Sequence, residues 1–239
     1  MAPYNPDAVP MEQWGLMEVL TYTKQNHHAP NPSTDPTKVS LPTPFTVCII
    51  GASRGIGAGI ATSYAQAGAS GIVLASRRMS GLESVRDRCK AINPDVQIEI
   101  ITCDITSAPS VASLATETHS RFGRLDVLVV NSGVTGAPTQ RLGDDTTADA
   151  FAVTDVNYTG TYYAAIHFTP LLLASTGGAK AFITVNSAST LLVRGPVAAA
   201  KYGISKLAQA RLTEMMHEQY SGEGLVAFAV HPGAVLTEL

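Results

Sequence analysis

The sequence predicts a single α/β domain in which helices cover both faces of a doubly wound parallel sheet. Three observations lead to this fold class. Short apolar runs rich in β-branched residues alternate with helical stretches six times between residues 45 and 233. The first run ends in a glycine-rich turn, as the first strand of such sheets often does. Apolar residues make up 45% of the 239-residue chain and charged residues 15%, which suits a large buried core.

Continuous apolar runs that end at glycine or a polar residue predict the strands, because parallel strands are buried on both faces. They cover residues 45–50, 71–76, 96–104, 125–133, 179–189 and 225–233. Helices are expected over residues 57–69, 80–92, 110–123, 148–175 and 199–220. Ser80 is expected to cap the second of these helices, and Gly123 to close the third.

The first 44 residues differ from the rest, because they hold eight of the 14 prolines. Proline at this density prevents regular structure over most of a segment. We expect a partly ordered surface arm, or an arm that packs on a neighbouring subunit, with one short helix over residues 11–23. His27 and His28 in this arm have no partner cysteine or carboxylate, so no metal site is predicted.

Composition excludes several classes of protein. The net charge of −3 and the absence of a basic run argue against a nucleic-acid partner. No run of about 18 apolar residues predicts a membrane span, and the N-terminus lacks the pattern of a secretory signal. Cys48, Cys89 and Cys103 are scattered and show no CxxC spacing. They are expected to be small buried residues in a reducing compartment, so we expect a cytoplasmic protein.

The turn after the first strand reads GASRGIG, from Gly51 to Gly57. Its glycines allow a tight turn and let the backbone approach a ligand closely. The helix that follows offers unpaired N–H groups and its positive dipole end to a phosphate. Placed after the first strand of six alternating units, this turn predicts a dinucleotide site.

The end of the second strand indicates which dinucleotide binds. A carboxylate there would bind the ribose 2′-hydroxyl of NAD. The sequence instead reads LASRR, with Ser76 at this position and Arg77 and Arg78 after it. Arginines suit a 2′-phosphate, and Arg54 in the glycine turn adds a further cation. These residues predict NADP(H).

The stretch YGISK places Tyr202 and Lys206 four residues apart, so both side chains lie on one face of the predicted helix. On a solvated helix this pair would mean little. Beside a nicotinamide, the tyrosine would be an acid catalyst and the lysine its activator. A free phenol ionises only near pH 10, and a nearby ammonium favours the phenolate.

Together these motifs resemble the short-chain dehydrogenase/reductase family over residues 45–239, with the Rossmann-like fold that this implies. The glycine turn, CDIT (103–106), NSG (131–133), YGISK and HPG (231–233) follow in the family's order, although Ile50 stands where a threonine usually precedes the turn. The resemblance implies these cofactor-binding residues: Gly51, Ser53, Arg54, Gly55, Ile56, Gly57, Ser76, Arg77, Arg78, Asp104, Ile105, Asn131, Gly133, Tyr202, Lys206, Pro232, Gly233, Val235 and Thr237.

The resemblance also implies the catalytic roles. Tyr202 exchanges a proton with the substrate oxygen, and Lys206 activates the tyrosine and holds the nicotinamide ribose. A serine polarises the oxygen. Ser187, fifteen residues before Tyr202, is favoured over Ser189, thirteen before it. Asn157 in the long helix would hold a water that links the lysine to solvent.

The implied activity is NADPH-dependent reduction of a ketone or aldehyde, reversible as an alcohol dehydrogenase. An isomerase or dehydratase on the same scaffold, or a truncated cofactor binder without catalysis, stays open. Neutral residues expected at the mouth favour an apolar substrate: Val134, Thr190, Leu191 and Val193. The resemblance also implies that subunits pair through the long helix and the Tyr202 helix. Both stretches keep small and apolar residues, so we expect a homodimer.

The chain stops after HPGAVLTEL. In the family about fifty more residues normally follow, and they form the loop and helix that cover the substrate, a seventh strand and a final helix. We therefore expect the domain at residues 45–239 to lack this region, either as part of a longer protein or as a short form with an open substrate side.

Overall fold

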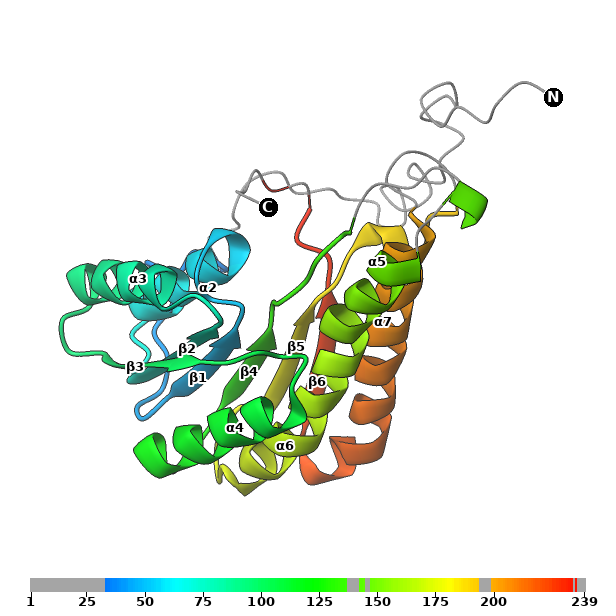
Figure 1. Cartoon of the computed structure of the whole chain (residues 1–239). Coiled ribbons are helices and arrows are strands. Elements are labelled where there is room, and N and C mark those ends of the chain that lie inside the picture. Colours follow the sequence, from blue (N-terminus) through cyan, green and yellow to red (C-terminus); the bar gives the residue numbers. More distant parts are fainter. Residues whose placement is uncertain (1–32, 137–141, 145–146, 194–198, 234, 236–239) are drawn as a thin grey trace.

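The computed structural model describes residues 33–136, 142–144, 147–193, 199–233 and 235, which form one sheet between two layers of helices (Figure 1). Most of the N-terminal arm lies outside the described residues, including the helix expected over residues 11–23 and both histidines.

Six strands pair in parallel in the order β3-β2-β1-β4-β5-β6, which confirms the predicted doubly wound fold. The continuous apolar character of β1, β2 and β4 follows from burial on both faces, whereas the edge strands β3 and β6 are partly exposed. In this order β1 and β4 are neighbours, at the point where the winding reverses and sheets of this class bind ligands. The strands are β1 (Thr46–Ile50), β2 (Gly71–Ser76), β3 (Gln97–Thr102), β4 (Val127–Val130), β5 (Ala181–Val185) and β6 (Val226–Val230).

Helices α2 (Gly55–Gln66) and α3 (Met79–Ile92) cover one face of the sheet, and α4 (Ala108–Phe122), α6 (Gly160–Ala174) and α7 (Ala200–Tyr220) cover the other (Figure 1). Successive residues of a strand point to opposite faces. Val47 and Ile49 of β1 therefore pack under α2 and α3, while Cys48 and Ile50 join the core under α4, α6 and α7. All three cysteines are buried and free.

The long helix expected over residues 148–175 contains a π-helical turn. It runs as α5 (Thr147–Thr154), the π turn η4 (Asp155–Thr159) and α6. Such turns inside a helix often accompany functional sites. Gly160 directly after the turn lies against Ile105, since a Cβ added there would come within 2.7 Å of the Ile105 side chain.

Helix ends bear out one prediction and correct another. Gly123 closes α4 in the left-handed region, with φ of 65°, as expected. Ser80 does not cap α3, because the helix begins at Met79 with Arg78 in the N-cap position. The Ser76 hydroxyl instead accepts a hydrogen bond from the Arg78 N–H at 3.2 Å and so starts the turn earlier.

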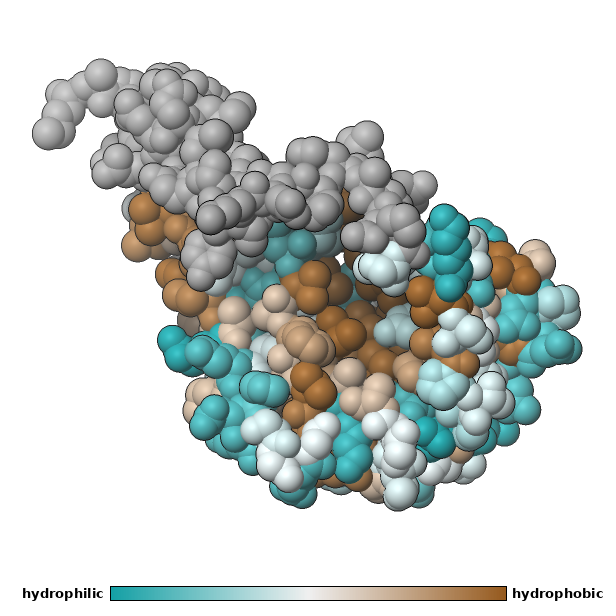
Figure 2. Space-filling model, turned by 180° about the vertical axis from the view of Figure 1, so that it is seen from behind, coloured by the Kyte–Doolittle hydropathy of each residue, from teal (hydrophilic) through white to brown (hydrophobic). Residues whose placement is uncertain are grey.

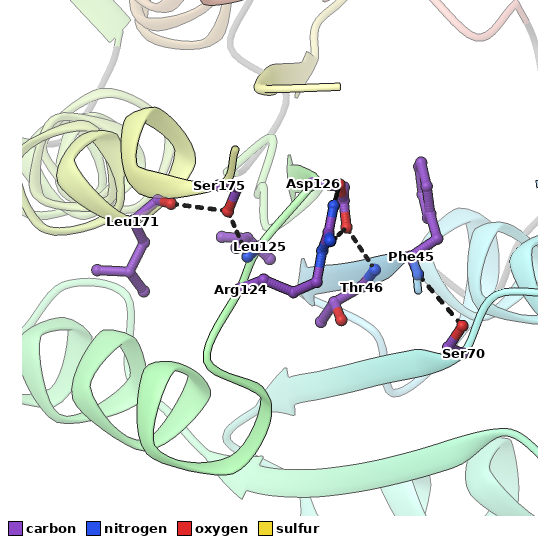
Figure 3. Close-up of polar contacts among 8 residues, drawn as sticks. All are labelled: Phe45, Thr46, Ser70, Arg124, Leu125, Asp126, Leu171 and Ser175. Carbon is purple, nitrogen blue, oxygen red and sulfur yellow. Dashed lines mark hydrogen bonds and ion pairs between the residues drawn. The ribbon is translucent and has the colours of Figure 1, made fainter. Parts of the chain in front are cut away.

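Buried polar contacts join the amino ends of the strands (Figure 3). The Asp126 carboxylate, just before β4, accepts two bonds from Arg124, at 2.6 and 2.9 Å, and one from the Thr46 N–H at 2.8 Å. Ser175 after α6 accepts a bond from the Leu125 N–H at 2.8 Å. These contacts satisfy backbone groups that strand pairing leaves open, and so they stabilise the amino end of the sheet.

Seen from behind, apolar side chains gather in a hollow across the middle of the molecule (Figure 2). Among the exposed apolar residues are Phe228 and Val230 of the edge strand β6. Within the described part of the chain, no helix has the length and apolar character needed to span a bilayer.

Candidate active site

A cleft of about 960 Å³ opens at the carboxyl ends of the strands. It brings together residues that the sequence spreads from the first strand to the last. Eighteen of the predicted site residues line it: Gly51, Ser53, Arg54, Gly55, Ile56, Ser76, Arg77, Arg78, Asp104, Ile105, Asn131, Gly133, Ser187, Tyr202, Lys206, Pro232, Gly233 and Val235. Thr237 lies outside the described residues. Gly57 and Asn157 are not part of the cleft wall.

The glycine turn leaves no space for side chains at two of its positions. Gly51 has φ of +93°, and a Cβ there would lie 2.6 Å from the Ser132 nitrogen. A Cβ on Gly57 would lie 2.2 Å from the Gly51 oxygen. The Asn131 amide donates to this same oxygen at 2.8 Å. Gly57 therefore supports the turn from behind, and the backbone in front of α2 stays open to a phosphate.

Cations and one acid line the end of the cleft next to β2 and β3. Arg77 and Arg78 follow Ser76 directly, and Arg54 takes the N-cap position of α2. Asp104 after β3 accepts bonds from the Thr106 N–H at 3.0 Å and hydroxyl at 2.8 Å. These bonds, with a smaller contribution from the charge of Arg77, lower the pKa of Asp104. No carboxylate occupies the position after β2.

Tyr202 and Lys206 lie one turn apart on α7, at the centre of the cleft. The Lys206 ammonium is 6.0 Å from the centre of the Tyr202 ring. Only 3% of Lys206 is exposed. Its Nζ donates to the Val185 carbonyl at 2.8 Å and to the Gln209 side-chain oxygen at 3.0 Å. Burial lowers the pKa of Lys206 from 10.5 to about 8.

Ser187 and Ser189 differ in position. Ser187 lies just beyond β5, at the start of the short turn Ala188–Thr190, and lines the cleft. Ser189 is buried, does not line the cleft, and its hydroxyl lies 2.9 Å from the Ser187 hydroxyl. The Ser187 N–H donates to the Asn186 side chain at 2.7 Å, which fixes the turn. Of the two serines, Ser187 is the one with access to a ligand in the cleft.

Asn157 is fully buried in the π turn, behind the cleft. Its side-chain oxygen accepts from the Val134 N–H, and its amide donates to the Val134 carbonyl and to the Ser205 hydroxyl, each at 2.9 Å. Ser205 in turn donates to the Tyr202 carbonyl at 2.8 Å. The side chain therefore joins the segment after β4, at Val134, to the helix that carries Tyr202. The predicted water relay stays a prediction.

Sequence reasoning missed two polar residues beside Lys206. Asn186 lines the cleft, and its amide donates to the Lys206 carbonyl at 2.9 Å. Gln209 is completely buried and accepts from the Lys206 ammonium. The only signal for Gln209 was its spacing, since a residue three positions after Lys206 shares its helix face. Of the expected mouth residues, Val134 lines the cleft.

A parallel sheet with a glycine turn, a Tyr–Lys pair and a serine around one cleft defines a nucleotide-dependent oxidoreductase class. The comparisons with known proteins agree. The family model described as short chain dehydrogenase matches residues 45–239. The chain therefore belongs to the short-chain dehydrogenase/reductase family, whose members use NAD(P)(H) and act on small molecules.

One relative is the short chain dehydrogenase pgmD of Aspergillus terreus, 35% identical over 231 residues, which cover 92% of this chain and 72% of the relative. Levodione reductase shares the fold, with a TM-score of 0.76, 24% identity and coverage of 81% and 73% of the two chains. The RhlG/NADP active-site complex of Pseudomonas aeruginosa has a TM-score of 0.74 at 26% identity, with coverage of 83% and 75%.

Proposed function

We propose that this protein is an NADPH-dependent reductase of ketones or aldehydes that runs in reverse as an alcohol dehydrogenase. One observation carries the proposal. Ser187, Tyr202 and Lys206 line the same cleft as the glycine turn and the arginines after β2. A substrate oxygen between Ser187 and Tyr202 would therefore lie in the cleft that also receives the nucleotide.

Two features favour NADP(H) over NAD(H). Arg77 and Arg78 line the cleft directly after β2, where an acid would otherwise bind the ribose 2′-hydroxyl. Arginine suits a 2′-phosphate through charge-assisted bonds. The RhlG structure was solved with NADP. The open backbone at Gly51 fits the pyrophosphate in both cases, so the arginines make the distinction.

The nicotinamide, when bound, supplies the hydride for reduction. Ser187 donates a hydrogen bond to the substrate carbonyl and polarises it. Tyr202 gives its proton to the same oxygen as negative charge develops there. Lys206, held as a cation by Val185 and Gln209, favours the phenolate that remains and can donate a further bond towards the nucleotide. Asn157 positions the wall of the cleft through Val134 and Ser205.

We also propose a cytoplasmic homodimer. Exposed apolar side chains occupy the outer surfaces of α6 and α7, which the dimer would bury: Tyr162, Ile166, Ile204, Leu207 and Met215. Three free, buried cysteines suit a reducing compartment. Sedimentation velocity on the purified chain tests the dimer, and a purely monomeric protein at micromolar concentration would contradict it.

The proposed function is tested by titrating NADPH and NADH, followed by nicotinamide fluorescence, into the wild type, Arg77→Ala and Arg86→Ala. Arg86 is a matched control because it lies on α3, pairs with Asp87 and is not part of the cleft. We expect NADPH to bind more tightly than NADH, and Arg77→Ala to lose about 10- to 100-fold in NADPH affinity alone. Arg86→Ala should match the wild type.

A panel of apolar ketones and aldehydes then follows, read at the absorbance band of reduced nicotinamide. Failure to bind either nucleotide contradicts the proposal for this chain. Turnover without an absorbance change would favour an isomerase or dehydratase, and binding without turnover would favour a cofactor binder. A clear preference for highly charged substrates would contradict the apolar substrate class.

A further inference from the structure

Lys206 is a buried cation held by neutral groups. Its two hydrogen-bond acceptors are the Val185 carbonyl and the Gln209 side-chain oxygen. No described carboxylate forms an ion pair with it. A Cβ added to Gly133 would lie 3.4 Å from its Nζ, so the ammonium lies directly beside the segment that follows β4. An ammonium has three donors, and the two acceptors therefore leave one N–H for the cleft.

The network fixes the orientation of the Gln209 amide. Thr161 of α6 donates its only hydroxyl proton to the Asn157 carbonyl at 2.8 Å. It can therefore only accept from Gln209, whose nitrogen lies 2.8 Å away. The Gln209 oxygen must then face Lys206, at 3.0 Å, and the Asn186 amide, at 3.4 Å. The amide has no second orientation that satisfies these groups.

We propose that Gln209 is a positioning residue that holds the Lys206 ammonium in place and, through Asn186, joins it to the turn that carries Ser187. The inference rests on the proposed function, in which Lys206 and Ser187 act on cofactor and substrate. Asn186 connects the two parts, because its amide reaches the Lys206 carbonyl and Gln209 while its oxygen accepts from the Ser187 N–H.

A neutral acceptor at position 209 has a specific consequence. An amide oxygen stabilises the ammonium through a dipole and leaves its full positive charge acting on Tyr202. A carboxylate would also hold the ammonium but would cancel most of that charge. A leucine would remove the acceptor and favour the neutral amine. Gln209→Glu and Gln209→Leu should therefore shift the pKa of Lys206 in opposite directions.

The other titratable groups must be accounted for in such a test. Tyr202 lies on the same helix as Lys206. Among the described residues, no titratable side chain of η4, α6 or β5 is hydrogen-bonded to the Lys206 ammonium. The remaining titratable or charged residues in the cleft wall are Arg54, Arg77, Arg78, Cys103, Asp104 and His231. A control variant on α7 leaves all of them in place.

Thr213→Val is that control. Thr213 is buried like Gln209, lies one turn further along α7, and donates to the Gln209 carbonyl at 2.9 Å. Its hydroxyl also lies 3.1 Å from that of Thr184. It makes no described hydrogen bond to Lys206. The variant thus removes a buried polar group from the same helix without changing the acceptors of the ammonium.

The first measurement needs no cofactor. The pH dependence of unfolding of the apo-protein by urea reports the pKa of Lys206 in each variant. We expect Gln209→Glu to raise this pKa by about one unit or more, Gln209→Leu to lower it, and Thr213→Val to leave it in place. The same Lys206 pKa in the wild type and all three variants would overturn the inference, whether or not the wild type binds NADPH.

The second measurement is the pH profile of kcat/KM for oxidation of a secondary alcohol with NADP⁺. In Gln209→Glu the acid limb should move to higher pH, because less positive charge acts on Tyr202. Gln209→Leu should lose at least about tenfold in kcat, with NADPH affinity changed less. Profiles that overlay those of the wild type and Thr213→Val would overturn the positioning role, whereas absence of nucleotide binding in the wild type would count against the proposed function alone.

Discussion

The buried charges at the two ends of the sheet have different kinds of partner. At the amino end, Asp126 is 1% exposed and receives two bonds from Arg124 and one from the Thr46 N–H (Figure 3). At the carboxyl end, Lys206 is 3% exposed and has only a carbonyl and an amide oxygen as acceptors. The first charge is neutralised, and the second is left uncompensated.

The difference separates a structural ion pair from a candidate catalytic cation. A buried charge needs a partner or its charged form becomes unfavourable. Asp126 has that partner, and its bonds connect β1 with the start of β4. Lys206 lacks one, and burial lowers its pKa to about 8. An uncompensated ammonium destabilises the folded state but keeps its charge available to Tyr202, which is the trade-off expected at a functional site.

The largest expected effect concerns catalysis by Lys206→Met. Removing the cation that supports Tyr202 should lower kcat/KM for carbonyl reduction by about 10³-fold, or about 4 kcal/mol. Lys90→Met is the control, because Lys90 lies on α3, outside the cleft, and donates to the exposed Pro94 carbonyl. Steady-state kinetics on both variants measures the effect. Activity within tenfold of the wild type in Lys206→Met would contradict a catalytic role of the Lys206 cation.

The next effect is the pH dependence of stability. The folded pKa of Lys206 lies at about 8 and its usual value is 10.5. Between these pH values the unfolded chain binds more protons, so the free energy of unfolding should rise with pH. The rise should reach about 3 kcal/mol and be absent in Lys206→Met. Urea unfolding from pH 7 to pH 10.5 tests it, and parallel curves for the two proteins would contradict it.

The smallest effect is expected from Asp126→Asn. The amide keeps an acceptor for the Thr46 N–H but loses the charge that Arg124 neutralises. Arg124 retains 23% exposure and can regain water, so the expected loss in free energy of unfolding is about 2 kcal/mol. The kcat of the folded variant should stay at the wild-type value. A loss of kcat at unchanged stability would show that the two ends of the sheet are not independent.

Local patterns made the order of the elements predictable. Continuous β-branched runs identified the six strands, and Gly123 marked a helix end by its chemistry. The predicted N-cap at Ser80 was wrong. Capping preference by itself does not take account of the hydrogen bond from the Arg78 N–H to the Ser76 hydroxyl. The π turn at Asn157 had no local signal. It coincides with contacts to Val134 and Ser205, which are distant in the sequence.

The sequence by itself determined the class of sheet, the glycine turn and the register of Tyr202 and Lys206, since strand periodicity, glycine conformation and helix spacing are local properties. The sequence favoured Ser187 over Ser189, and the tertiary structure shows that Ser187 lines the cleft while Ser189 does not. Tertiary structure alone decided that Gln209 holds Lys206. Those outcomes depend on which donors and acceptors meet when α6, α7 and β5 pack together. The spacing of residues along one helix or strand does not show which side chains of different elements come into contact.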